Sequence, residues 1–123
     1  MREFLKSKIH GGTVTQAELT YEGSFGIDQD WMDEVGISPF EAIEVYNITN
    51  GSRLKTYAIP FARGSKQLQS NGAAAHLIRV GDKVIIASYA WLSDQDLEKF
   101  RGPKIMILGE DNAKKKFYEP TWR

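Results

Sequence analysis

The sequence contains no cysteine and only two histidines, His10 and His76, among its 123 residues. The lack of cysteine excludes disulfides, a thiol nucleophile, iron–sulfur clusters and zinc–thiolate sites. Two histidines that lie far apart in the sequence are a poor basis for a metal site. We therefore expect a protein that uses no metal.

The sequence also lacks a surplus of charge and any long apolar run. Lys and Arg total 16 and Asp and Glu total 16, so the formal net charge is zero. Phosphate binding needs a basic surplus, so nucleic acid is not expected as a partner. No segment approaches the ~18 consecutive apolar residues of a membrane span, and the first residues lack the apolar stretch of a signal peptide. We expect a cytoplasmic protein with no membrane partner.

What is present fits one globular domain over residues 1–123. The chain is 41% hydrophobic and 26% charged, and no linker divides it; single domains cluster near ~100–150 residues. Residues 43–48 alternate apolar and polar, Asn50-Gly51 is a strong hairpin signal, and residues 53–59 provide the return strand. Residues 83–89 and 104–108 are further apolar strands. The pattern predicts a mainly β fold of short strands.

Three short helices and one weak repeat complete this prediction. Asp28 is expected to cap a helix that ends at Gly36, Asn71 to cap residues 72–76, and a capping-box pattern to open a helix over residues 93–100. Residues from 114 onward are expected to form a solvated or loosely docked end and not a binding patch. The pairs at 35–36 and 80–81 are both Val-Gly and both precede an expected strand, which favours a barrel of two similar halves.

Candidate binding residues lie on two of the expected strands. Lys8 and His10 are two residues apart and should share a face, where they are able to bind an anion. Arg53, Lys55 and Tyr57 share a face of another strand, and Thr56 points to the opposite face. The Arg53 guanidinium suits a carboxylate because it forms bidentate pairs. The alternative for both strands is an ordinary solvated face.

A further candidate is the turn formed by Asn71, Gly72, Ala73 and Ala74. It leads directly into an expected helix start, where unpaired backbone N–H groups favour an anion. The alternative is a plain helix start with no ligand.

Gly-Ser pairs allow a different kind of chemistry. A serine hydroxyl can attack the preceding carbonyl and turn the amide into an ester, and a preceding glycine offers little steric obstruction. β-Elimination then breaks the chain, and hydrolysis of the resulting dehydroalanine leaves a pyruvoyl group. The sequence has three such pairs, Gly23-Ser24, Gly51-Ser52 and Gly64-Ser65. Composition does not choose among them, and an ordinary turn is the alternative for each.

Several of these stretches together resemble the pyruvoyl-dependent aspartate 1-decarboxylase family. Each piece is modest alone, but their order and spacing are specific, and the likeness extends from about residue 6 to residue 92. The matching stretches are Lys8-Ile9-His10, Leu19-Thr20-Tyr21-Glu22-Gly23-Ser24, Ile27-Asp28-Gln29-Asp30, Asn47-Ile48-Thr49-Asn50-Gly51, Arg53, Thr56-Tyr57-Ala58-Ile59, Asn71-Gly72-Ala73-Ala74-Ala75-His76, Val80-Gly81-Asp82 and Val84-Ile85-Ile86-Ala87.

The resemblance implies a six-stranded double-psi β-barrel with a few short helices, assembled as a homotetramer with active sites between subunits. It implies self-cleavage between Gly23 and Ser24, which yields a β chain of residues 1–23 and an α chain of residues 24–123. Ser24 becomes a covalent pyruvoyl group. Whether cleavage is spontaneous or needs a maturation factor as a partner stays open.

The implied reaction is decarboxylation of L-aspartate to β-alanine and CO2, for pantothenate biosynthesis. The substrate amine forms a Schiff base with the pyruvoyl ketone, which takes the electron-sink role that pyridoxal phosphate has elsewhere. By resemblance, Tyr57 donates the proton that replaces the lost carboxylate. A decarboxylase with pyridoxal phosphate bound to Lys8 is the other alternative. It is not expected, because such enzymes are far longer and this chain has no room for a domain that holds the cofactor.

The resemblance also assigns the remaining site residues. Arg53 and Lys8 match cations that hold substrate carboxylates, and His10 matches a histidine at the site. Thr56 matches a residue of self-cleavage, where its hydroxyl is able to stabilise an oxyanion. The residues that match the wall around the pyruvoyl group and substrate are Asn71, Gly72, Ala73 and Ala74.

Two positions depart from the family pattern. Gly11-Gly12 follows His10 where an arginine and a bulkier residue are expected, a change able to loosen that strand end. Phe25 follows Ser24 where a small or thiol residue is common, a change able to slow maturation. The alternative function is an unprocessed barrel of the same fold that acts as a binding or structural module, because fold does not determine function.

Overall fold

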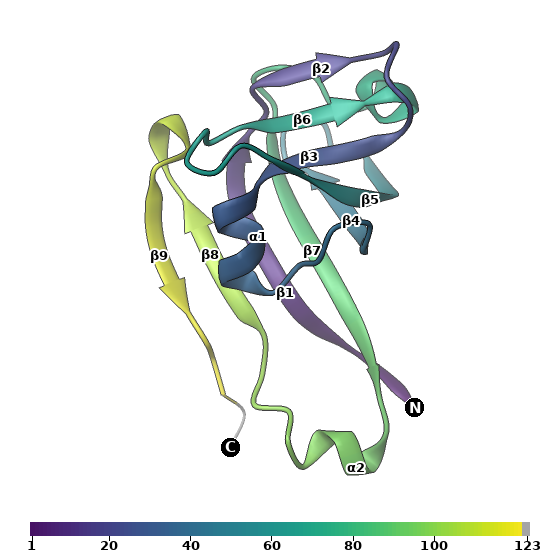
Figure 1. Cartoon of the computed structure of the whole chain (residues 1–123), viewed down its shortest axis with the longest axis vertical. Coiled ribbons are helices and arrows are strands. Elements are labelled where there is room, and N and C mark those ends of the chain that lie inside the picture. The colour runs from purple at the N-terminus through teal and green to yellow at the C-terminus, as the bar shows by residue number, and fades with distance from the viewer. Residues whose placement is uncertain (122–123) are drawn as a thin grey trace.

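The computed structural model describes residues 1–121, which form nine strands and a few short helices (Figure 1). In chain order the elements are β1 (Arg2–Thr13), β2 (Gln16–Glu18), β3 (Ser24–Asp28), α1 (Gln29–Val35), β4 (Ala42–Asn47), β5 (Arg53–Phe61), β6 (Leu68–Asn71), the 3-10 helix η1 (Gly72–His76), β7 (Lys83–Leu92), α2 (Asp94–Leu97), β8 (Lys104–Leu108), the 3-10 turn η2 (Glu110–Asn112) and β9 (Lys114–Tyr118). The prediction of a mainly β fold with a few short helices is confirmed.

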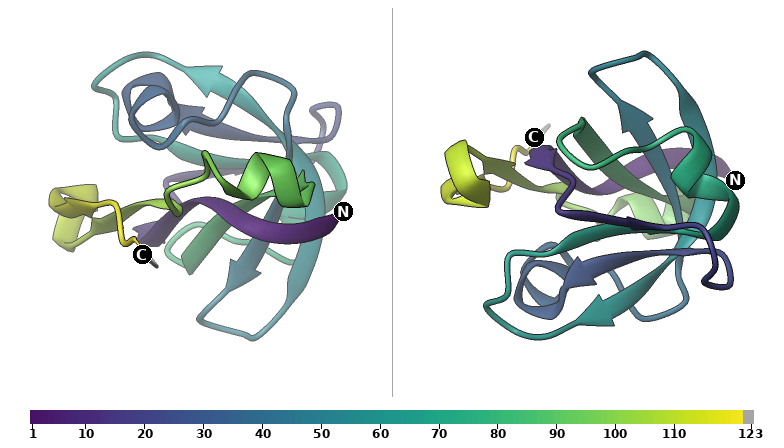
Figure 2. Two further views of the ribbon diagram at one scale, coloured as in Figure 1. Left: turned by 90° about the horizontal axis from the view of Figure 1, so that it is seen from below. Right: turned by 90° about the horizontal axis from the view of Figure 1, so that it is seen from above.

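All nine strands join in one hydrogen-bonded sheet of order β2-β6-β3-β5-β4-β7-β1-β8-β9. In Figure 1 the strands β2, β6 and β3 run across the top, while β7, β1 and β8 are steeply inclined, β7 downward and β1 and β8 upward, so the sheet is strongly twisted. The two end-on views in Figure 2 show the sheet curling around the interior. This curvature is compatible with a β-barrel-like fold.

The strand count among residues 1–121 exceeds the six expected, because segments at both ends of the sheet order also find pairing partners. The short β2 pairs in parallel with β6, and β9 pairs antiparallel with β8. The expectation of a solvated or loosely docked end is therefore correct for the exposed lysine side chains, but the backbone of residues 114–118 forms a paired strand. Although Lys114 begins the strand, Phe117 packs against the core and holds it in place.

The core explains both departures from the family pattern. Phe25 is fully buried in the main hydrophobic cluster with Ile27 and Val45. Gly11 has a φ of +83° at a bulge of β1, and pairing with β7 resumes at Gly12. A Cβ on Gly12 would lie 2.4 Å from Leu68 Cδ1, so glycine at this position of β1 leaves room for the Leu68 side chain of β6. The strand end is not loosened, since β1 stays paired through its last residue.

The short helices begin as expected. Asp28 caps α1 through the Asp30 backbone N–H, and α1 ends at Gly36 in the left-handed conformation. The capping box of Ser93 and Asp96 opens α2, but the helix ends at Leu97 and not near residue 100. No helix among residues 1–121 has the length and apolar character needed to cross a membrane.

Asp28 also connects two segments that are distant in sequence. Its buried carboxylate accepts backbone N–H groups from Asp30 at 2.9 Å, Gly64 at 3.2 Å and Lys66 at 2.9 Å. We expect Asp28→Ala to lower the free energy of unfolding by about 2–4 kcal/mol, because the helix loses its cap and buried donors lose their acceptor. Urea unfolding followed by circular dichroism measures the change.

Asp33→Ala is the matched control for this prediction. Asp33 is an exposed aspartate that pairs with Arg63 on the surface. An exposed ion pair of this kind contributes about 0–1 kcal/mol. Equal losses in the two variants would contradict the role given to Asp28.

Candidate active site

The Gly23–Ser24 peptide bond lies at the start of β3, at a boundary between solvent and core. Gly23 is exposed, whereas only 3% of Ser24 is accessible. Ser24 is paired with Asn71 of the antiparallel neighbour β6, and the Asn71 Nδ2 donates to the Ser24 Oγ at 2.9 Å. The hydroxyl of Ser24 is thus held in place by the Asn71 side chain, directly after an exposed glycine.

Asn71 does not cap the following helix, which corrects the expectation from sequence. It makes no side-chain hydrogen bond to η1, and its amide is used in the site. The Asn71 Oδ1 accepts from the Gln69 Nε2 at 2.7 Å, while Nδ2 is directed to Ser24. Gln69 is a buried site residue that sequence reasoning missed. Its spacing of two from Asn71 on a strand was the signal available.

Gly72 allows the turn after β6 to approach the cleavage segment closely. Its φ is +65°, and a Cβ there would lie 2.8 Å from the Tyr21 carbonyl oxygen and 3.0 Å from the Gly23 nitrogen. Both contacts are with backbone, which cannot move aside cheaply. A side chain at position 72 would therefore displace the backbone next to Ser24.

A cavity of about 220 Å³ opens beside Gly23. It is lined by Gly23, Leu54, Lys55, Thr56, Asn71, Ala73, Ala74 and Leu77. The small side chains of Ala73 and Ala74 leave this space open, and Thr56 provides a hydroxyl in its wall. Most of the predicted self-cleavage and wall residues thus meet at one place.

The predicted cationic residues gather on the outer face of the sheet instead. Directly paired residues share a face, and the pairing puts His10, Ile85, Tyr46 and Arg53 in one row across β1, β7, β4 and β5. The next row consists of Lys8, Ala87, Glu44 and Lys55. The expectation that Lys8 and His10 share a face is confirmed.

The positive charge of these two rows comes from Lys8, Arg53 and Lys55, and Glu44 lies between Lys8 and Lys55. Partial burial, and then the nearby Lys8 ammonium, lower the pKa of His10 below its usual value. The imidazole is therefore mostly neutral near pH 7. A neutral His10 can donate or accept a hydrogen bond but adds little positive charge.

Tyr57 and Thr56 point to opposite faces of β5, as alternation predicts. Tyr57 is paired with Ala42 on the outer face, and its ring lies 6.2 Å from that of Phe40. Thr56 is paired with the buried Ile43. None of Lys8, His10, Arg53 and Tyr57 lines the cavity beside Gly23. One chain therefore holds two separate groups of candidate residues.

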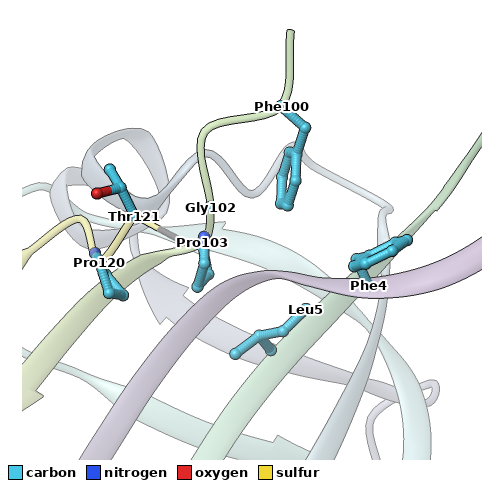
Figure 3. A pocket seen from close by; sticks show the side chains of 7 residues that line it. All are labelled: Phe4, Leu5, Phe100, Gly102, Pro103, Pro120 and Thr121. Atoms are coloured by element: carbon cyan, nitrogen blue, oxygen red, sulfur yellow. The ribbon is translucent and has the colours of Figure 1, made fainter. Parts of the chain in front are cut away.

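A second, apolar cavity of about 370 Å³ lies near the chain ends (Figure 3). It is lined by Phe4, Leu5, Phe100, Gly102, Pro103, Pro120 and Thr121, so no titratable side chain faces it. In the described part of the chain, no three His, Asp or Glu side chains gather as a potential metal site.

Together, the fold and the cavity beside Gly23 define a small β-sheet protein in which a buried serine follows an exposed glycine. Residues 1–115 match the aspartate decarboxylase family. The chain is also 47% identical to an aspartate 1-decarboxylase of Ralstonia nicotianae. The 111 aligned residues cover 90% of this chain and 92% of that relative. The chain belongs to the aspartate decarboxylase family and is a carboxy-lyase.

Proposed function

We propose that this protein decarboxylates L-aspartate to β-alanine and CO2 for pantothenate synthesis, with a pyruvoyl group that it makes from Ser24. The observation that supports this most directly is the Ser24 hydroxyl, buried and held by Asn71 beside the accessible Gly23. Of the three Gly-Ser pairs, this one has its serine fully buried, since Ser52 and Ser65 are half-buried.

The first step of maturation is attack of the Ser24 Oγ on the Gly23 carbonyl carbon. The new C–O bond replaces the C–N bond, so the amide becomes an ester and the Ser24 nitrogen becomes a free amine. The Thr56 hydroxyl borders the same cavity and is placed to donate to the oxyanion that forms during attack. The space beside the Gly23 Cα is open, because a Cβ on Gly23 would meet nothing within 4 Å.

The second step is elimination. A base removes the Cα proton of Ser24, the Cβ–Oγ bond breaks, and Gly23 leaves as a carboxylate. The dehydroalanine at position 24 then takes up water and releases ammonia, which leaves a ketone. The chain of residues 1–23 stays attached after the cut, because β1 is hydrogen-bonded to β7 and β8 and β2 to β6.

The residues around Ser24 fit a small ketone at this position. Asn71 offers a hydrogen-bond donor, and Ala73 and Ala74 leave space in the cavity. When present, the pyruvoyl ketone supplies an electrophile and electron sink that no encoded side chain offers. Substrate binds against the wall formed by Asn71, Gly72, Ala73 and Ala74.

The outer face supplies the remaining roles. Aspartate has two carboxylates, and Arg53 and Lys8 are the cations that bind them, with the neutral His10 beside them. The Tyr57 hydroxyl donates a proton to the carbon that has lost CO2. These residues lie apart from the Ser24 cavity within one chain. We therefore propose a homotetramer in which the outer face of one subunit meets the cavity of another.

Intact-mass spectrometry of the purified protein tests the proposal. We expect two species whose masses sum to the precursor plus water minus ammonia, and β-alanine production by the processed sample. The precursor mass is 13.9 kDa. A single species of that mass after long incubation, alone and with host-cell extract as a source of a maturation factor, would favour the unprocessed binding module instead.

A further inference from the structure

We propose that Tyr46, anchored by Tyr89, is a positioning residue that sets the place and plane of the Arg53 guanidinium for a substrate carboxylate. The inference rests on the proposed function, in which Arg53 binds the substrate. It adds two residues that composition and motif had not singled out.

The contact between Arg53 and Tyr46 is a stacked cation–π pair. The guanidinium carbon lies 4.0 Å from the centroid of the Tyr46 ring, well inside the ~6 Å limit for this interaction. The two residues are directly paired between β5 and β4, so the stacking follows from the strand register. An arginine that stacks by its face keeps its N–H edge free for a bidentate carboxylate.

The guanidinium has no protein carboxylate to bind. In residues 1–121, Arg53 forms no ion pair with an aspartate or glutamate. Arg53 is also exposed, so only the aromatic ring restricts the many rotamers of its side chain. The Tyr46 ring is thus the contact that orders this cation before substrate arrives.

The ring itself is held at its far end. The Tyr46 and Tyr89 hydroxyl oxygens are 2.8 Å apart, and Tyr89 belongs to β7 on the other side of β4. Burial, followed by the hydrogen bond with Tyr89 and the charges of Tyr89 and Glu44, raises the pKa of Tyr46 to about 12, although Arg53 acts in the opposite direction. The phenol therefore stays protonated near neutral pH, where both aspartate carboxylates are ionised.

The position of Tyr46 in the row links it to the second cation. Tyr46 lies between Ile85 and Arg53, and His10 is on the other side of Ile85. Lys8 is in the next row of the same face. Fixing Arg53 against Tyr46 therefore sets its distance from Lys8, and a fixed distance between two cations selects ligands with two carboxylates.

The test uses the processed enzyme and four variants: Tyr46→Leu, Tyr46→Phe, Tyr89→Phe and the double Phe variant. We expect Tyr46→Leu to raise the KM for aspartate by about 5- to 10-fold with kcat within about two-fold, because ring stacking is lost. Tyr46→Phe keeps the ring and loses only its anchor, so KM should rise about two- to three-fold. Tyr89→Phe should match it, and the double variant should be no worse than either.

Succinate binding, measured by calorimetry, provides a readout besides activity. Succinate has two carboxylates but no amine, so it reports the cationic face alone, and its affinity should fall in the same order as the KM rises. Tyr118→Phe is the matched control, since Tyr118 is a tyrosine of β9 that contacts Lys116 and not Arg53. Cleavage measured by mass should be unchanged in all five proteins.

Three results would overturn the inference. One is a Tyr46→Leu KM no higher than that of Tyr118→Phe. Another is loss of kcat or of cleavage without a change in KM or succinate affinity, which would mean a structural role. The third is additive effects of the two Phe changes. If Tyr46→Leu does not fold, the KM and succinate affinity of Tyr46→Phe, Tyr89→Phe and their double variant test the inference.

Arg53→Ala separates this inference from the proposed function. If Arg53→Ala leaves KM and succinate affinity unchanged, the proposed role of Arg53 fails. If Arg53→Ala raises KM and Tyr46→Leu does not, only the positioning role fails. If Arg53 binds substrate and Tyr46 positions it, adding Tyr46→Leu to Arg53→Ala should cause no further rise in KM or loss of succinate affinity, because the ring then has no guanidinium to orient.

Discussion

Ser24→Ala is expected to leave the chain uncut and to abolish β-alanine production. The substitution removes the one atom placed to attack the Gly23 carbonyl, so neither the ester nor the ketone can form. The methyl group fits the buried position, and the cost is the loss of the acceptor for Asn71, about 1–3 kcal/mol. The protein should therefore fold, and intact mass together with a β-alanine assay measures the effect.

The other Gly-Ser pairs supply the controls. Ser52→Ala and Ser65→Ala change serines that also follow a glycine, but both are half-buried, whereas Ser24 is buried. Both variants should be cut and active like the parent. β-Alanine formed by Ser24→Ala would refute the mechanism, and loss of cleavage in Ser65→Ala with an intact fold would mean that the wrong pair had been chosen.

Tyr57→Phe is expected to lower kcat by about 10²- to 10⁴-fold while the chain is still cut. A positioned general acid contributes a factor of that size, and phenylalanine has no proton to donate. The ring contact with Phe40 is kept, so the local structure of β5 should not change. Because the hydroxyl acts after substrate has bound, KM should change little. Steady-state kinetics on samples of equal cleavage, judged by mass, measures both parameters.

Tyr118→Phe again serves as the control, with kcat expected within about two-fold of the parent. A loss of less than about three-fold in Tyr57→Phe would remove Tyr57 as the proton donor. Failure of cleavage in that variant would place the hydroxyl in maturation instead.

The faces of the site strands could be predicted from sequence because strand alternation is local. A period of two places the side chains of Lys8 and His10 on one face of their strand. It also places Arg53 and Tyr57 on one face of β5 and Thr56 on the other. The strand register confirms these placements. The cap by Asp28 and the capping box of Ser93 were also predictable. In both cases the bonded groups are two or three residues apart in the chain.

Contacts between distant segments could not be predicted in this way. Asn71 was interpreted as a helix cap because the helix start follows it, but Ser24 is 47 residues away and competes for the same amide. The three lysines at 114–116 favour a solvated or loosely docked end. The backbone of this segment nevertheless pairs with β8, and Phe117 packs against the core. Tyr46 and Tyr89 are 43 residues apart and gave no motif.

The sequence by itself determined a mainly β chain without thiols, the faces of its candidate residues and its family resemblance. These depend on composition, local alternation and the order of short motifs. Only the tertiary structure decided that Ser24 is buried against Asn71, that Gly72 leaves room for that segment, and that Tyr46 lies under Arg53. Each of these depends on strand pairing between segments far apart in the chain, and such pairing is a property of the whole sheet.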